Sequence, residues 1–202
     1  MDPRRRVGQG LRHALGGGTL IPRIALIGLP ASGKTSVGRE LAAALGLPFL
    51  DSDELVEAEA GKPVAAIIEK EGEPGFRARE SRALAAAAAG PPCVLATGGG
   101  IVLSADNREL LRGRFTVVWL RVSPEVAASR AASAPGSRPL LGRGDPAGRM
   151  RELDEARRGL YAGTARLIVD ASSAAPRELA RELAETLAPG EPGAAGDGSA
   201  PC

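Results

Sequence analysis

Short apolar runs and longer amphipathic segments alternate along this chain. Five runs of three to seven residues are apolar and bounded by turn residues, which predicts buried strands. The segments between them repeat apolar residues at intervals of three and four, which predicts helices. The predicted strands are residues 23–27, 48–51, 93–97, 115–121 and 167–169, and the predicted helices are residues 34–45, 53–60, 63–71, 76–89, 104–112, 124–132, 149–163 and 176–188.

This order of elements predicts an α/β protein with three layers, in which helices cover both faces of a central five-stranded parallel sheet. We expect a single domain over residues 22–188. Residues 1–21 lack periodicity and are predicted to be a flexible extension, and residues 189–202 are predicted to be a disordered tail. Within the domain, residues 133–148 are rich in Gly, Pro and Arg and fit no regular element.

The most specific motif follows the first predicted strand. Gly28-x4-Gly33-Lys34-Thr35 matches the phosphate loop, whose backbone N–H groups surround phosphates at a helix N-terminus. Lys34 would place its charge on the β- and γ-phosphates, and Thr35 would offer its hydroxyl to Mg²⁺. A chance match in a glycine-rich chain is the alternative, but the strand before the motif and the helix after it favour nucleoside triphosphate binding. The residues predicted to bind the nucleotide here are Gly28, Ala31, Ser32, Gly33, Lys34, Thr35 and Ser36.

Three further groups are placed where ligands bind in such a sheet, near the carboxyl ends of strands. Asp51 and Asp53 would point to the same side of an extended chain, although Asp53 could simply cap the next helix. Arg77 and Glu80 lie three residues apart on a predicted helix and could be a weak surface ion pair. Residues 98–100 are all glycine, which allows close approach of a ligand to the backbone but also occurs in ordinary loops.

Composition excludes several classes of protein and of functional site. The formal net charge is +2, which gives no support for nucleic-acid or membrane-surface binding. The chain has one His and two Cys, too few for His-based catalysis, a disulfide framework or a metal site built from these residues. No apolar run reaches the roughly 18 residues of a membrane span, and no signal-peptide core follows the N-terminal arginines. We therefore expect a cytoplasmic protein.

Together these motifs resemble the shikimate kinase family. The resemblance covers about residues 23–188 and rests on the order and approximate spacing of six motifs. The phosphate loop is shared with a very large superfamily, whereas the other motifs narrow the resemblance to this family. The six are the phosphate loop, Asp51-x-Asp53, Gly72-Glu73-x-x-Phe76-Arg77-x-x-Glu80, Gly98-Gly99-Gly100, Arg138-Pro139-Leu140-Leu141 and Arg157-x-x-x-Tyr161.

The resemblance implies a P-loop kinase fold with a mobile lid over residues 133–148. It also implies transfer of the γ-phosphoryl group of ATP to the 3-hydroxyl of shikimate, with Mg²⁺, in chorismate and aromatic amino acid biosynthesis. Asp53 would hold the acceptor hydroxyls and act as the general base. Lys34 and Arg138, the latter on the lid, would be the other catalytic residues and would bind ATP, with Arg138 neutralising charge on the transferring phosphoryl group. Asp51 and Thr35 would hold Mg²⁺, and Arg130 would lie against adenine.

On the acceptor side, the resemblance implies that Arg77 and Arg157 hold the carboxylate of shikimate, because a guanidinium can bind a carboxylate through two parallel hydrogen bonds. Glu80 would orient Arg77, and Phe76 would pack against the ring of shikimate. Gly98, Gly99 and Gly100 would complete the shikimate site, with the last two offering N–H groups. Because Arg157 and Arg158 point about 100° apart on a helix, only one of them can face the site.

Two alternatives remain open. Another small-molecule kinase of similar plan, such as a gluconate kinase, would share the phosphate loop, although Arg77, Arg157 and the three glycines argue against it. A catalytically silent nucleotide-binding regulator should lack Lys34, Asp53 or Arg138, and all three are present. Ala31 departs from the family pattern, which usually has glycine at that position. Since no stripe typical of an interface is evident, we expect a monomer.

Overall fold

The computed structural model describes residues 23–133 and 145–187. Its centre is a sheet of five parallel strands in the order β2-β3-β1-β4-β5. The strands are β1 (Ile24–Ile27), β2 (Phe49–Asp51), β3 (Val94–Ala96), β4 (Thr116–Arg121) and β5 (Leu167–Asp170). The predicted five-stranded parallel sheet is therefore confirmed, and each strand begins or ends within about a residue of its predicted bounds.

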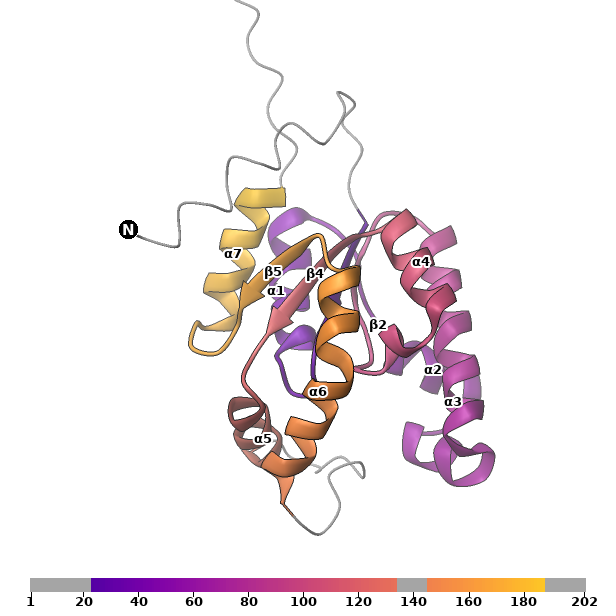
Figure 1. The fold of residues 1–202 in the computed structure, drawn as a ribbon. Helices are drawn as coiled ribbons and strands as arrows, with labels where there is room; N and C mark the ends of the chain where they lie inside the picture. The colour runs from indigo at the N-terminus through magenta and orange to yellow at the C-terminus, as the bar shows by residue number, and fades with distance from the viewer. Residues whose placement is uncertain (1–22, 134–144, 188–202) are drawn as a thin grey trace, which may run out of the picture.

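Helices cover both faces of the sheet, as predicted (Figure 1). They are α1 (Lys34–Leu45), α2 (Ser52–Ala60), α3 (Val64–Ala89), the short 3₁₀ turn η2 (Ile101–Leu103), α4 (Ala105–Arg114), α5 (Pro124–Ser133), α6 (Pro146–Thr164) and α7 (Pro176–Leu187). Helices α1 and α7 pack against each other on one face, while α4 and α6 contact β4 from the other. In Figure 1, α2 and α3 lie together on the side of the molecule away from α7.

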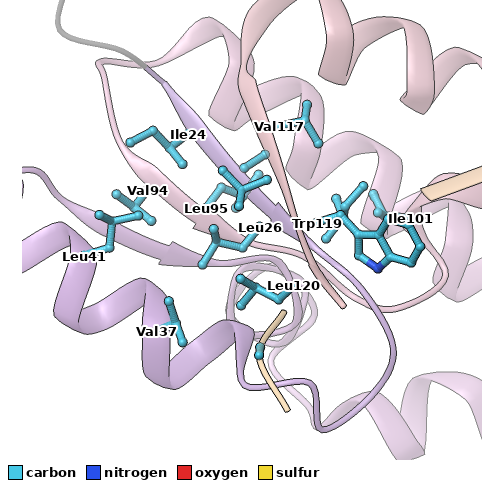
Figure 2. Close-up of a cluster of buried hydrophobic side chains, with 14 of the residues drawn as sticks. Ile24, Leu26, Val37, Leu41, Val94, Leu95, Ile101, Val117, Trp119 and Leu120 are labelled. Atoms are coloured by element: carbon cyan, nitrogen blue, oxygen red, sulfur yellow. The ribbon is translucent and has the colours of Figure 1, made fainter. Parts of the chain in front are cut away.

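The hydrophobic core forms on both faces of the central strands. All four residues of β1 are fully buried, which explains why this run is continuously apolar rather than alternating. Figure 2 shows Val37 and Leu41 of α1 on one side of the sheet, and Trp119 with Ile101 on the other. A second, smaller cluster holds α2 against α3 and consists of Val56, Ile67, Phe76 and Ala83. The α2–α3 unit therefore has a small core of its own.

Helix α3 contains the break that the sequence predicts between residues 71 and 76. Gly72 has φ 72° and ψ 173°, a conformation outside the helical region and available almost only to glycine. The two predicted helices therefore follow each other directly but are separated by a kink at this one residue. Pro74 and Gly75 follow the break and belong to the second helical segment, which begins earlier than predicted.

Two other boundaries differ from the sequence predictions. Helix α6 begins at Pro146 rather than near residue 149, because proline is well suited to the first helical turn. Residue 133 is the last residue of α5, so neither end of the predicted lid is irregular. The rest of that segment, including Arg138, lies outside the described residues, as do the predicted extension and tail. Among the residues that the structure describes, no helix is long and apolar enough to cross a membrane.

Candidate active site

The candidate site lies at the carboxyl edge of the sheet, where the predicted site residues that the structure describes lie near one another. The phosphate loop follows β1, Asp51 ends β2, and the three glycines follow β3. Helix α5 and the segment after β5 complete the edge, with Arg130 of α5 donating to the carbonyls of Ala171 and Ser172 at 2.8 and 3.0 Å. Arg130 is thus next to the loop that follows β5, at the opposite end of this edge from Asp51.

The phosphate loop has a backbone that its sequence explains. Gly28 has φ 146°, and a Cβ there would lie 2.5 Å from the Leu120 carbonyl oxygen, so this position requires glycine. Gly33 has φ 96° and is the N-cap of α1. Ala31 has φ 58° and is the one non-glycine residue with positive φ in the described chain. This conformation explains why a glycine is usual at position 31.

Lys34 is buried by the loop itself, with 8% of its surface exposed. Its Nζ donates to the carbonyl oxygens of Gly28 and Leu29 at 3.0 and 2.7 Å and to Ser32 Oγ at 3.3 Å. The ammonium group is therefore held directly beneath the loop. Because an ammonium has three rotatable donors, it can exchange these contacts for phosphate oxygens.

Asp51 links the phosphate loop to the start of α2. Its Oδ2 accepts a hydrogen bond from Thr35 Oγ1 at 2.9 Å, and its Oδ1 accepts from the Asp53 N–H at 3.0 Å. Asp51 is therefore the N-cap of α2, and the prediction that Asp53 lies in an extended segment, or caps the helix, is wrong. Asp53 lies in the first turn instead, where its carboxylate is beside Gly98: a Cβ on that glycine would lie 3.2 Å from Asp53 Oδ1.

The oxygens of Thr35 and Asp51 suit a magnesium ion. Mg²⁺ prefers hard oxygen ligands and usually keeps several waters, so one carboxylate and one hydroxyl beside bound phosphates are sufficient. The hydrogen bond between Thr35 and Asp51 shows that the two side chains converge on one point next to the phosphate loop. The residues present therefore fit the predicted ion.

Arg77 and Glu80 are not a surface pair. Glu80 is fully buried and accepts a hydrogen bond from Arg77 Nη1 at 2.8 Å. Burial raises the pKa of the Glu80 carboxyl, and the Arg77 charge opposes that rise. For Arg77, burial acts to lower the pKa, but Glu80 and Glu73 outweigh it and the pKa is raised. Such a buried, oriented pair is typical of a functional site.

The three glycines make room for these charges. A Cβ at Gly98 would overlap the Glu80 carboxylate, and one at Gly100 would overlap the guanidinium of Arg77. The Gly98 N–H already donates to Ser52 Oγ at 2.8 Å, so this donor is used within the protein. The glycine run is therefore needed for packing of charged side chains against the backbone, and the ordinary-loop explanation fails.

Helix α6 holds the same glycine loop from its other side. Arg157 Nη1 and the Tyr161 hydroxyl both donate to the Gly99 carbonyl, at 3.1 and 2.5 Å. Burial raises the pKa of Tyr161 to about 12, so this hydroxyl stays protonated and remains a donor. Arg158 instead pairs with Asp154 and is largely exposed, so of the two arginines Arg157 is the one that contacts the glycine loop.

The sequence did not assign every residue that shapes the site. Phe76 is buried in the α2–α3 core, with the Arg77 guanidinium carbon 5.2 Å from its ring centre, so its predicted contact with a ligand ring stays a prediction. Ser52 and Glu73 lie within the motifs, but the sequence alone assigns neither of them a role. A cavity of about 290 Å³ opens beside Arg77, and its wall includes Glu73, Gly100 and Asn107.

Fold and site together define a class of protein. A parallel sheet with a phosphate loop after its central strand, a lysine beneath that loop and a nearby pair of acidic residues is the arrangement of a phosphate-loop kinase. The partly buried Arg77 at the glycine loop is a residue type that suits an anionic group.

Comparison with known proteins identifies the family. The shikimate kinase family model matches residues 30–188. Shikimate kinase from Symbiobacterium thermophilum is 48% identical over 165 residues, covering 81% of this chain and 95% of that protein. The structure of shikimate kinase from Acinetobacter baumannii in complex with shikimate is 40% identical, with a TM-score of 0.79 over 83% of this chain and 93% of that chain. The chain belongs to the shikimate kinase family.

A gluconokinase structure from Sinorhizobium meliloti 1021 is also similar, at 23% identity and a TM-score of 0.53, covering 85% of this chain and 94% of that one. At this identity the likeness shows a shared fold and no more. The family match therefore confirms the shikimate kinase prediction rather than the gluconate kinase alternative.

Proposed function

We propose that this chain transfers the γ-phosphoryl group of ATP to the 3-hydroxyl of shikimate, with Arg77 and Arg157 holding the carboxylate of the acceptor. One observation carries the assignment of the two arginines. Arg77 packs flat against Gly100, and Arg157 donates to the carbonyl of Gly99, so two guanidinium groups meet consecutive residues of one loop. A carboxylate bound there would be held by two cations in a partly buried setting, where charged hydrogen bonds are strong.

The nucleotide side of the reaction belongs to the phosphate loop. Its N–H groups and Lys34 would bind the phosphates, and Arg130 would lie beside the base near the loop after β5. Thr35 and Asp51 would hold Mg²⁺, which neutralises charge on the phosphates when it is bound. Arg138, outside the described residues, stays a predicted contact to the transferred phosphoryl group.

Asp53 is the proposed base. It lies at the start of α2 beside Gly98, between the phosphate loop and the arginines, and a carboxylate there could accept the proton of an attacking hydroxyl. Asp53→Asn should lower kcat by about 10²–10⁴-fold and leave ATP binding largely intact. The control is Asp106→Asn on the exposed surface of α4. Near-normal turnover of Asp53→Asn would overturn this assignment.

A coupled assay of ADP release tests the whole proposal, with ATP and Mg²⁺ and with shikimate, quinate and gluconate as acceptors. We expect strong turnover with shikimate alone. Turnover only with another acceptor would contradict the assignment of Arg77 and Arg157. Bound ATP with no turnover on any acceptor would favour a regulatory protein.

We also infer a cytoplasmic monomer. Cys93 is a buried free thiol, as expected of a core residue in a reducing compartment. Within residues 23–133 and 145–187, the large apolar side chains that are exposed are Leu103 and Ile168, on different elements. Two separate residues do not form the kind of apolar patch that a stable interface requires. Sedimentation equilibrium at about 10 µM enzyme tests this inference, and the mass of a dimer would contradict it.

A further inference from the structure

Arg77 has a second carboxylate partner besides Glu80. Its Nη2 donates to Glu73 Oε1 at 2.8 Å, one helical turn earlier on α3. The two partners differ in burial: 1% of the Glu80 side chain is exposed, against 58% for Glu73. Exposed ion pairs are weak and easily broken, whereas a buried pair is costly to break. Glu80 is therefore a fixed partner of Arg77, and Glu73 is an exchangeable one.

The edge of Arg77 that meets Glu73 is only half used. In a guanidinium, Nε and Nη2 form one edge that can bind both oxygens of a carboxylate. Glu73 accepts from Nη2 through one oxygen, while Arg77 Nε is buried and makes no hydrogen bond with any described residue. A carboxylate in bidentate contact with this edge would satisfy both donors at once. Such an incoming group would form the better pair.

The contact between Arg77 and Glu73 borders a cavity that an incoming carboxylate could enter. Glu73, Arg77 and Gly100 all line the cavity of about 290 Å³ beside α3. The Glu73 side chain can swing away into solvent without moving the backbone, since it is exposed and lies on a helix. Two internal carboxylates already pair with Arg77, so a third carboxylate would be repelled by their negative charge unless one of them leaves.

We propose that Glu73 is a specificity-determining residue, an internal carboxylate that occupies Arg77 until the carboxylate of the acceptor replaces it. This inference rests on the proposed function, because it takes Arg77 to be the acceptor's partner. An acceptor without an anionic group would leave the pair between Glu73 and Arg77 intact and gain no charged contact there. Glu73 therefore lowers the affinity for acceptors whose anionic group must displace it from Arg77, and it leaves the affinity for neutral acceptors unchanged.

The test is Glu73→Gln, which keeps the shape of the side chain and removes its charge. Since the pair is exposed, we expect a fall of about 2–5-fold in the KM for shikimate, with the KM for ATP unchanged. The matched control is Glu69→Gln, which removes the same charge from an exposed position on α3. A KM that stays the same or rises in Glu73→Gln would overturn the inference, because Glu73 would then be inert or would hold Arg77 in place.

Arg77→Ala separates this inference from the proposed function. If Arg77 binds the acceptor, this variant raises the KM for shikimate far more than the KM for ATP. The double variant Arg77→Ala with Glu73→Gln should then have the same KM for shikimate as Arg77→Ala alone. If Arg77→Ala affects both KM values equally, the proposed contact itself is wrong. If Arg77→Ala behaves as expected and Glu73→Gln alone has no effect, only the exchange is wrong.

Discussion

At the scale of single residues, the site depends on Glu80, a buried carboxyl group that orients Arg77. Glu80 Oε2 accepts from Arg77, while its Oε1 is buried and makes no hydrogen bond with any described residue. Leaving a buried acceptor unsatisfied costs about 1–3 kcal/mol. The same oxygen lies where a Cβ at Gly98 would be, so glycine at that position is what allows Glu80 to approach the loop.

This burial makes a prediction about pH. Burial raises the pKa of Glu80 above its usual value of 4.5, so in the pH range above 4.5 the native state binds more protons at this residue than the unfolded state does. The contribution of Glu80 to stability therefore falls as the pH rises through that range. Glu80→Gln cannot titrate, so its stability relative to the parent protein should increase from pH 4.5 to pH 8.

Urea denaturation of Glu80→Gln and of the parent protein between pH 4.5 and pH 8 measures the difference in their free energies of unfolding. A difference in unfolding free energy that is constant with pH, or that shifts in favour of the parent at high pH, would contradict a raised pKa. Activity provides a second reading: because Glu80 orients Arg77, the variant should show a higher KM for shikimate even where its stability is greater.

At the scale of elements, α3 matters because it carries Phe76, Arg77 and Glu80 on the segment that follows Gly72. With φ 72° and ψ 173°, Gly72 redirects the helix, and an ion pair between Arg79 and Glu71 links the two segments. Arg79 donates to Glu71 across the break at 2.9 Å, and Lys62 donates to the same carboxylate at 3.2 Å. The break thus places the arginine at the glycine loop while α2 and α3 share a small core.

Gly72→Ala should destabilise the protein by about 1–3 kcal/mol, because a side chain is strained in this region of φ and ψ. The matched control is Gly113→Ala in α4, where a Cβ would have nothing within 4 Å. That change should be neutral or stabilise by up to about 1 kcal/mol. Equal effects of the two changes in chemical denaturation would show that Gly72 is not under conformational constraint.

The helices and strands could be predicted from the sequence where neighbouring residues determine them. Strands and helices follow from short apolar runs and periodicity, and the break in α3 follows from Gly72 and Pro74. The cap of α2 could not be chosen, since Asp51, Ser52 and Asp53 are all good caps. The burial of Glu80 was also hidden, because residues 98–100, distant in sequence, create it. A spacing of three residues looks the same in a surface pair and in a buried one.

At the scale of the whole molecule, the strand order divides the site into two halves. The phosphate loop follows the central strand β1, α2 and α3 lie towards β2, and α5 lies on the side of β4 and β5 (Figure 1). The proposed nucleotide residue Arg130 on α5 and the proposed acceptor residue Arg77 on α3 therefore come from opposite sides of this edge. The family's motifs predict which residues take part, and the sheet order determines which of them are neighbours.

A ligand that joins these halves should stabilise the molecule. ATP with Mg²⁺ at 100 times its Kd should add about 2.7 kcal/mol of stability, which for a domain of this size raises Tm by about 5–10 °C. Lys34→Met should lose most of this shift, measured from its own baseline, because Lys34 lies directly beneath the loop. Lys70→Met, at an exposed position of α3, is the control and should keep the shift. A full shift in Lys34→Met would show that this lysine contributes little to nucleotide binding.

The contact between Trp119 and Tyr161 has an optical consequence. The chain contains one tryptophan and one tyrosine, and their ring centres are 5.7 Å apart, with the tyrosine hydroxyl bonded to Gly99. Nearly all near-ultraviolet absorbance and fluorescence of the protein therefore originate at one place, immediately behind the glycine loop. Any ligand that shifts this loop changes the emission of Trp119, so the unlabelled enzyme carries its own probe for following acceptor binding in real time.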